Sequence, residues 1–430
     1  MFKLISNAVK AFVNFIYGVA NDVANFLTGR GAPFPPWSWT VNSDTSASRT
    51  NNEIDGMIKA FMQQHGVKAG QFSLFVNGNL TVSSAYSWGE SDYPITKPDS
   101  VMRVASCSKA FTTAAILDLM DPPAGAPLLR ADDKVFDILL PPSTRPFPLP
   151  VDSRVKNITV KHLLEHTGGW NYRTGPNALR DWVFHLKEIG RDLSMHTPPE
   201  KEDFARYVLC NVTLDFDPGM RPSELFTPPG QPSKPMNTYS NIGYVLLGMI
   251  VDAKASSFIG HLNNRVLRSI PISDVTVGKT RRADMLPNEV LYESPYAGPD
   301  ATIDPFDPKP APLPYGGDGS RKEVMDSGGG LIMSANSLAK FIGQNNVYLG
   351  TLDPTKTVRQ LKMRQNMTRY GSMPGTQAVA HCFQEKGGSK LYDMAVIFNK
   401  QDTSKTDPGD DSTDFDRLVR HLEGKIRDVF

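Results

Sequence analysis

The chain has 430 residues, and its 46 basic and 45 acidic side chains give a formal net charge of +1. This balance argues against nucleic acid or an anionic membrane as the main partner. The three cysteines, Cys107, Cys210 and Cys382, lie far apart and lack the spacing of a disulfide framework or a cysteine-based zinc site. The length suffices for two or three domains, or for one large domain with an insertion.

Residues 1–50 are expected to form an amphipathic N-terminal helix followed by a linker rich in proline and tryptophan. Apolar side chains recur at helical period over residues 1–27, but Lys10 and Asn14 interrupt any run long enough to span a membrane. We expect this helix to pack on the domain. Peripheral contact with a membrane surface and a signal peptide are the alternatives. We therefore favour a cytoplasmic location and leave secretion open.

The next segment, from residue 51 to residue 120, predicts the first part of an α/β core. Residues 51–65 have the pattern of a helix. Residues 71–77 and 80–88 alternate around an Asn-Gly turn at residues 77 and 78, which is typical of a β-hairpin.

The stretch Val101–Met120 then presents a serine, Ser106, three residues before a lysine, Lys109, at the start of an apolar helix. Residues three apart share a helix face, so the lysine nitrogen can reach the serine hydroxyl. A lysine desolvated by apolar neighbours loses its proton more readily and can serve as a base. The helix N-terminus also favours negative charge on the serine oxygen. Ser106 is therefore a candidate nucleophile.

The S-x-x-K spacing is not specific by itself, because it recurs at Ser153 with Lys156 and at Ser337 with Lys340. The ordinary interpretation of such a pair is a capping serine followed by a solvated lysine. Only the pair at Ser106 opens a long apolar helix that a core would bury.

Residues 121–322 predict an inserted helical region with long proline-rich loops, of which 291–319 is the longest. A loop of that length is expected to have a function, and it could border a site. The strand pattern returns at 376–383 and 394–398, before a terminal helix at 415–429. We therefore expect residues 51–120 and 323–430 to form one core around the insertion at 121–322.

A second motif, Tyr239-Ser240-Asn241, precedes an apolar helix and is the only Y-x-N in the chain. A phenol near an ammonium group can act as a base. The Asn241 amide can hold a carbonyl or an amide of a substrate. The ordinary alternative for Tyr239 is a core residue at a helix start.

Together these motifs resemble those of the serine β-lactamase and penicillin-binding-protein superfamily, in its class C-like branch with esterases, D-peptidases and fungal acyltransferases. The motifs follow in the order of that family: S-x-x-K at Ser106, I-T-V-x-x-L-L-x-H-T-x-G from Ile158, Y-S-N at Tyr239, G-G-L at Gly329 and S-M-P-G-T from Ser372. The resemblance implies an α/β (α+β) fold, a mostly antiparallel sheet flanked by helices with an inserted all-α domain, of the β-lactamase/transpeptidase type.

The resemblance also implies roles for individual residues. Ser106 would be the acylated nucleophile and Lys109 its activating partner. Tyr239 would be the general base that also protonates the leaving group, and Asn241 would orient the substrate. The backbone N–H groups of Ser106 and Ser372 would form the oxyanion hole, for which paired donors are worth about 3 kcal/mol each in related chemistry.

One motif departs from the family pattern, because Arg369, Tyr370 and Gly371 stand where K/H-T/S/G-G is usual. Arginine stays protonated, so it is a poor proton donor, but it can bind a carboxylate through two parallel hydrogen bonds. We expect Arg369 to favour an anionic substrate and the bulk of Tyr370 to narrow the cleft. β-Lactam turnover is correspondingly not expected.

The chain is thus predicted to be a serine hydrolase that acts on ester, thioester or amide bonds of a small-molecule acyl substrate, esterase-like and without a cofactor. One alternative is an acyltransferase of secondary metabolism that uses the same acyl-enzyme, with a carrier-bound or CoA thioester as the acyl donor. Another is a ligand-binding protein without turnover. A third is a zinc peptidase, because His162, Glu165 and His166 match H-x-x-E-H. The same segment also fits a structural helix of the family, in which the histidine packs.

Overall fold

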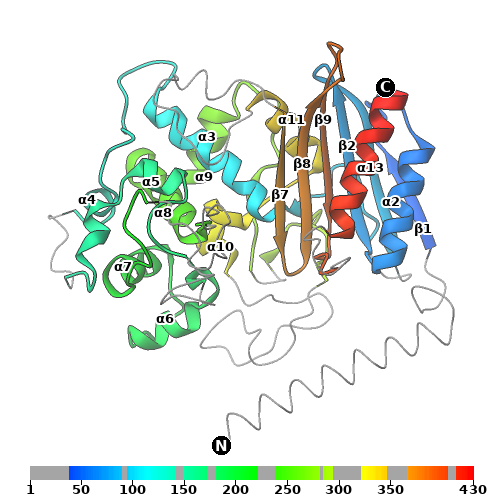
Figure 1. The fold of residues 1–430 in the computed structure, drawn as a ribbon. Helices are drawn as coiled ribbons and strands as arrows, with labels where there is room; N and C mark the ends of the chain where they lie inside the picture. The colour runs from blue at the N-terminus through cyan, green and yellow to red at the C-terminus, as the bar shows by residue number, and fades with distance from the viewer. Residues whose placement is uncertain are drawn as a thin grey trace, which may run out of the picture.

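The computed structural model describes residues 38–89, 94–141, 149–171, 181–220, 238–280, 284–293, 321–345, 366–404 and 413–430. The predicted N-terminal helix at 1–27 and nearly all of the proline-rich loop at 291–319 lie outside these ranges. Figure 1 shows a sheet with helices on both faces and a helical region beside it. The described strands are β1 Ser38–Ser43, β2 Ala69–Val76, β3 Asn79–Gly89, β4 Met102–Arg103, β5 Thr276–Val277, β6 Leu331–Met333, β7 Met367–Met373, β8 Thr376–Gln384 and β9 Leu391–Phe398.

Helices occupy the segments predicted at 51–65, after Ser106, after Tyr239 and at 415–429, with small shifts of their ends. The described helices are α2 Asn52–His65, α3 Ser108–Met120, α4 Val135–Leu139, α5 Val160–Leu164, α6 Leu186–Asp192, α7 Lys201–Asn211, α8 Asn241–Ala255, α9 Phe258–His261, α10 Lys322–Met325, α11 Ala335–Gln344 and α13 Asp414–Val429. Side chains cap several of them. Asn51 accepts from the first turn of α2, and Thr413 forms a capping box with Asp416 at the start of α13.

The main sheet has six antiparallel strands in the order β1-β3-β2-β9-β8-β7. The predicted hairpin at its centre is confirmed, since β2 and β3 flank Asn77 and Gly78, both with positive φ. Strand β1 lies in the segment predicted to be a linker, and its pairing with β3 makes residues 38–43 part of the sheet. That pairing corrects the interpretation of this part of residues 1–50.

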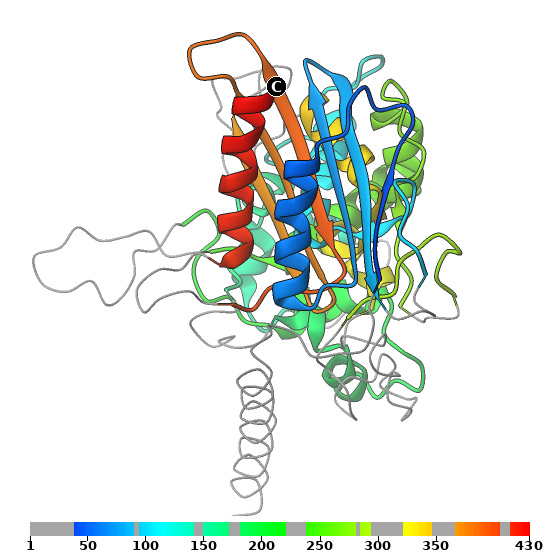
Figure 2. The same cartoon turned by 90° about the vertical axis from the view of Figure 1, so that its right-hand side faces the viewer.

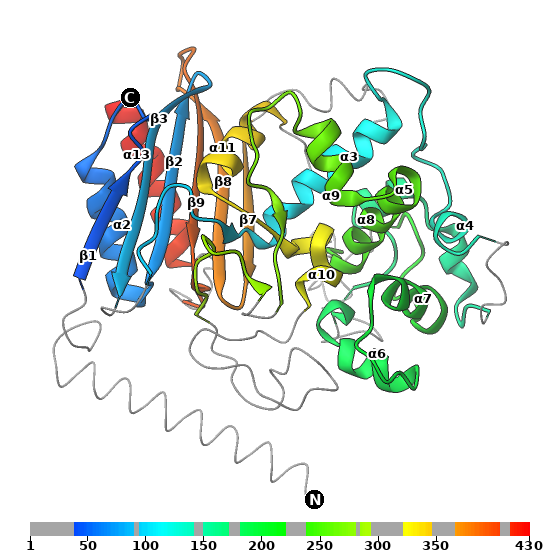
Figure 3. The same ribbon diagram turned by 180° about the vertical axis from the view of Figure 1, so that it is seen from behind.

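The two faces of the sheet carry different helices. Helices α2 and α13 lie side by side on one face (Figure 2), where they pack on large side chains such as Val379, Val396 and Phe398. On the other face, which Figure 3 shows, α11 and the helical region meet the smaller Ala378, Ala380 and Ala395. Neighbours along a strand point to opposite faces, so this alternation follows from the sequence of β8 and β9.

A second, three-stranded sheet in the order β4-β6-β5 joins the helical region to the core. Strand β4 precedes α3, and β6 leads into α11. The predicted α/β fold with a mostly antiparallel sheet flanked by helices is therefore confirmed. The division of the chain at residues 121 and 322 stays a prediction. Strand β5 of the predicted insertion pairs with β6 of the predicted core.

Within the described residues, no single helix is long and apolar enough to cross a membrane. Helix α8 and residues 258–266 together have the length and composition of a membrane span, but the two segments are bent by 74° relative to each other.

Candidate active site

A tight turn between β4 and α3 places Ser106 at the junction of the sheet and the helical region. Ala105 adopts a φ of 45°, which is uncommon for a residue with a Cβ and costs backbone energy. Ala105 and Cys107 are buried on either side, while Ser106 stays partly accessible. The turn thus holds the hydroxyl at the surface of an otherwise buried segment, as a nucleophile requires.

Lys109 lies one turn along the same helix and is fully buried. Its Nζ is 3.1 Å from Ser106 Oγ and donates to Asn241 Oδ1 across 2.6 Å and to the carbonyl oxygen of Gly328. Burial lowers the pKa of Lys109 to about 7, although the nearby charges of Asp181 and Cys107 oppose this shift. A substantial fraction of Lys109 is therefore neutral near pH 7 and able to accept a proton.

Tyr239 approaches the nucleophile from the start of α8. Its hydroxyl donates to Ser106 Oγ across 2.6 Å, and Lys109 Nζ lies 4.9 Å from the centre of its ring. The ring of His166 packs against it with centroids 4.5 Å apart, and His166 Nδ1 accepts the N–H of Ser240. His166 therefore supports the Tyr239 segment.

Asn241 connects Lys109 to a carboxylate. Its Oδ1 accepts from Lys109, and its Nδ2 donates to Asp181 Oδ2 across 2.6 Å. Burial raises the pKa of Asp181, while the Asn241 hydrogen bond and the Lys109 charge oppose that shift. No sequence motif includes Asp181, and it lies 60 residues before its partner, so spacing alone does not predict its place in the site.

The carbonyl of Gly328 was missed as well, since a backbone acceptor leaves no side-chain signal. Gly328 belongs to the segment that follows α10 and precedes β6. The only sequence signal there is the run of glycines in SGGGL, because glycine allows other groups to approach the backbone closely.

Strand β7 forms the edge of the main sheet beside the Ser106 turn. A Cβ on Gly371 would overlap the carbonyl oxygen of Val104, so a glycine is needed for this close packing. The hairpin from β7 to β8 turns at Pro374-Gly375, and Met373 pairs with Thr376. In a two-residue hairpin the closing pair is hydrogen-bonded, and hydrogen-bonded and non-hydrogen-bonded pairs alternate from there. Ser372 and Gln377 form the next pair, which is non-hydrogen-bonded, so the N–H of Ser372 points to the free edge of β7.

The two residues that depart from the family pattern point in opposite directions. Arg369 is 6% exposed and its charge lowers the pKa values of Cys107 and Tyr244, although burial raises both overall. It therefore lies on the helical side of the sheet. Tyr370 is 42% exposed on the other face, where its ring meets Phe415 of α13 edge-on. This position argues against the expectation that Tyr370 narrows the cleft.

The side chains of the alternative zinc motif each have another role. His162 Nδ1 accepts the N–H of Thr159 in a capping box, and Glu165 pairs with Lys161 at 2.7 Å. His166 supports the Tyr239 segment, as above. In the described part of the chain, no three His, Cys, Asp or Glu side chains gather as metal ligands would, so the zinc alternative gains no support.

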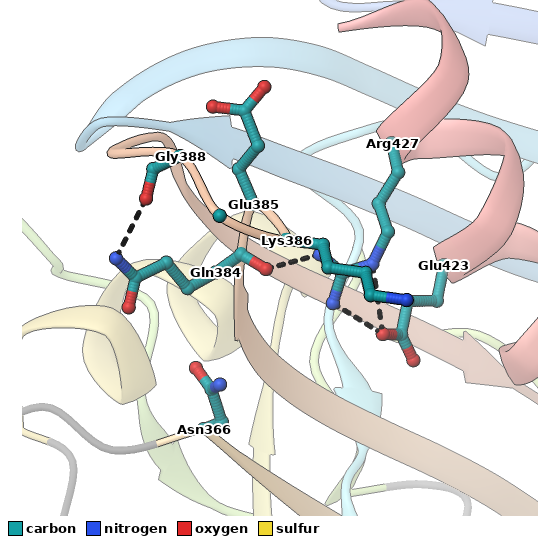
Figure 4. Close-up of a pocket in the computed structure, with 8 residues that line it drawn as sticks. Asn366, Gln384, Glu385, Lys386, Gly388, Glu423 and Arg427 are labelled. Atoms are coloured by element: carbon teal, nitrogen blue, oxygen red, sulfur yellow. Dashed lines mark hydrogen bonds and ion pairs between the residues drawn. The ribbon is translucent and has the colours of Figure 1, made fainter.

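A surface pocket of about 580 Å³ lies away from Ser106, and Figure 4 shows the residues that line it. It lies where β8 ends, between the β8–β9 loop and α13, and Arg427 bonds to Glu423 and to the Gln384 carbonyl within it. The Ser106 turn packs near the opposite end of β8, beside the β7–β8 turn. This pocket is therefore separate from the group around Ser106.

Comparisons with known proteins give a family match and two similar sequences. A family model described as Beta-lactamase matches residues 54–399. Two curated proteins of Dichelobacter nodosus are similar in sequence. The probable fimbrial assembly protein FimD of serogroup H1 is 26% identical over 266 residues, which cover 60% of this chain and 56% of that protein. The putative FimD of serogroup D is 26% identical over 223 residues, 51% of this chain and 46% of that protein. The chain thus spans about half the length of these relatives.

Several solved structures share the fold. A D-amino acid amidase from Ochrobactrum anthropi superimposes with a TM-score of 0.53 at 16% identity, covering 87% of this chain and 99% of that one. A D-stereospecific amidohydrolase from Streptomyces gives 0.52 at 17% identity, with coverage of 82% and 94%. A β-lactamase/D-alanine carboxypeptidase from Yersinia pestis gives 0.52 at 14% identity, with coverage of 87% and 100%.

Proposed function

The chain belongs to the β-lactamase family of serine hydrolases, and from this premise we propose that it cleaves ester, thioester or amide bonds of a small molecule through an acyl-enzyme on Ser106. The observation that carries the proposal is the position of Ser106 Oγ, 3.1 Å from a buried lysine and 2.6 Å from a tyrosine hydroxyl. A serine is a weak nucleophile at its ordinary pKa, and adjacent bases of this kind activate it.

In the proposed first step, Ser106 Oγ attacks the substrate carbonyl carbon while its proton passes to neutral Lys109. The developing oxyanion would accept from the N–H groups of Ser106 and Ser372. The orientation of Ser372 at the edge of β7 supports this assignment. The Tyr239 hydroxyl would then deliver a proton to the leaving group as its bond to the carbonyl carbon breaks, with Lys109 replenishing that proton.

In the second step, water attacks the ester on Ser106, and the proton that it loses returns to Ser106 through the same pair. Replacement of water by another hydroxyl or amine would make the protein an acyltransferase. Product analysis decides between these two outcomes. A carrier-bound or CoA thioester is one of the donors proposed for the transfer reaction.

The direct test is the intact mass of the protein after incubation with a panel of esters, thioesters, amides and β-lactams. Amides of D- and L-amino acids belong in the panel because two proteins of this fold are described as D-stereospecific amidohydrolase and D-amino acid amidase. We expect a mass increase equal to the acyl group, lost in Ser106→Ala and retained in Ser153→Ala and Ser337→Ala. A protein that no substrate and no serine-directed fluorophosphonate labels would instead be a binding protein without turnover.

A further inference from the structure

Asp181 is a half-buried partner of the site, and it belongs to none of the site's motifs. It directly precedes the short turn Trp182–Phe184, in which Trp182 and Val183 are buried and anchor the segment. Its Oδ2 accepts from Asn241 Nδ2 across 2.6 Å. An ionised carboxylate has acceptors only, so it requires the NH₂ end of the Asn241 amide to face it.

That requirement determines what Lys109 meets. With its NH₂ end on Asp181, the Asn241 amide presents Oδ1 to Lys109 Nζ at 2.6 Å. The carbonyl of Gly328 is a second obligate acceptor on the same nitrogen. A neutral lysine has two N–H donors and one lone pair. When Asn241 and Gly328 take both donors, the lone pair is left to face Ser106 Oγ, 3.1 Å away.

We infer that Asp181 is a positioning residue, which acts through Asn241 to hold the lone pair of neutral Lys109 towards Ser106. This inference rests on the proposed function, in which neutral Lys109 accepts the proton of Ser106.

The electrostatics of the site agree with this geometry. The charge of Asp181 raises the pKa of Lys109, as does that of Cys107, against the larger lowering effect of burial. The other groups around Lys109 are Tyr239 and Tyr244, whose rings lie 4.9 and 5.6 Å from Nζ.

More distant charges act on these neighbours. His166 packs on both tyrosine rings, and Arg369 influences Cys107 and Tyr244 from β7. His185 is near enough to Asp181 to oppose the rise of the Asp181 pKa. Removing the Asp181 charge therefore lowers the pKa of Lys109 further.

The test is Asp181→Asn, assayed over pH 5–9 with the best substrate of the panel. With a carboxamide at 181, the Asn241 amide is free to turn end for end and present donors to Lys109. We expect kcat to fall about tenfold to a hundredfold, as for misplaced catalytic groups. We also expect the acid limb of kcat/KM to move to lower pH, because less negative charge faces Lys109. A merely structural defect would not move that limb.

Three further variants sharpen the test. Asp132→Asn makes the same chemical change at an exposed position and should leave kcat and the acid limb of kcat/KM unchanged. Asp181→Glu keeps the charge, so its acid limb should stay near that of the unaltered protein even if kcat falls. In an Asn241→Ala background, Asp181→Asn should cause no additional loss of kcat. Circular dichroism and thermal unfolding establish that each variant is folded.

An unchanged kcat with an unmoved limb in Asp181→Asn would overturn the inference. A loss confined to KM would also overturn it, because Asp181 would then act on the substrate. Failure of the proposed function is recognised separately, since the unaltered protein would then form no acyl-enzyme. In that event, acetylation of Lys109 by trace acetic anhydride, measured as a function of pH, still tests the effect of Asp181 on Lys109. The pH midpoint of acetylation should be lower in Asp181→Asn, and an unchanged midpoint would refute the assignment.

Discussion

The hydroxyl of Tyr239 lies 2.6 Å from the hydroxyl of Ser106, although 133 residues separate them in the chain. The two residues meet because each stands at the start of a buried helix, and these helices, α3 and α8, contact one another. Lys109 and Asn241 follow Ser106 and Tyr239 in the first turns of these helices, and Lys109 Nζ lies 2.6 Å from Asn241 Oδ1. The contact of two helix starts therefore assembles most of the site.

Replacing Tyr239 by phenylalanine should lower turnover by roughly 10² to 10⁴, the range for loss of a positioned proton donor or base. Binding should change much less, because the ring and its packing on His166 remain. Stopped-flow measurement of acylation and the substrate dissociation constant separate these effects. Near-normal turnover would exclude Tyr239 from the mechanism.

The buried position of Lys109 predicts that kcat/KM of the unaltered protein rises with pH through about 7, the pKa to which burial lowers this residue. Below that pH, Lys109 is protonated and cannot accept the proton of Ser106. A profile without an acid limb in this region would contradict the assignment of Lys109 as a base.

The same lowered pKa links Lys109 to stability. Between pH 10.5 and about 7 the unfolded chain binds a proton at Lys109 that the folded protein does not, so the free energy of unfolding decreases as the pH falls through this window. Methionine at 109 does not titrate. The Tm of Lys109→Met relative to that of the unaltered protein should therefore rise from pH 10 to pH 7 and level off below. Calorimetry at four pH values tests this, and a constant difference would contradict it.

Substitution of Gly371 by alanine should disrupt the contact between β7 and the Ser106 turn, because the new methyl group would overlap the Val104 carbonyl. We expect a loss of stability of roughly 1–3 kcal/mol, typical of overpacking, together with a loss of acylation. Gly56→Ala in α2 is the matched control, since a Cβ there meets nothing within 4 Å. That variant should gain about 0.5–1 kcal/mol and keep full activity. Denaturant unfolding and the labelling assay measure both.

The burial of Arg369 favours a structural role over the anion binding that its charge suggests. Arg369→Lys should therefore reduce kcat/KM by a similar factor for a carboxylate substrate and for its neutral methyl ester. Measuring both substrates with both proteins decides the question. A loss restricted to the carboxylate would restore Arg369 as the residue that binds an anionic group.

The sequence alone determined the local features of this protein. The spacing of apolar residues and the Asn77-Gly78 turn predicted the β2–β3 hairpin, and the same spacing predicted the terminal helix α13. Such elements depend mainly on residues that are neighbours in the chain. The S-x-x-K and Y-x-N motifs selected Ser106, Lys109 and Tyr239 as candidate site residues, since each motif lies at one helix start.

Tertiary structure alone decided the rest. It brought Asp181 onto Asn241 and the Gly328 carbonyl onto Lys109, contacts between segments 60 and 219 residues apart that no spacing rule encodes. It added residues 38–43 to the sheet through pairing with β3. It also separated Arg369 from Tyr370, because adjacent residues of a strand face opposite sides of the sheet and only the packed helices determine which side carries the site.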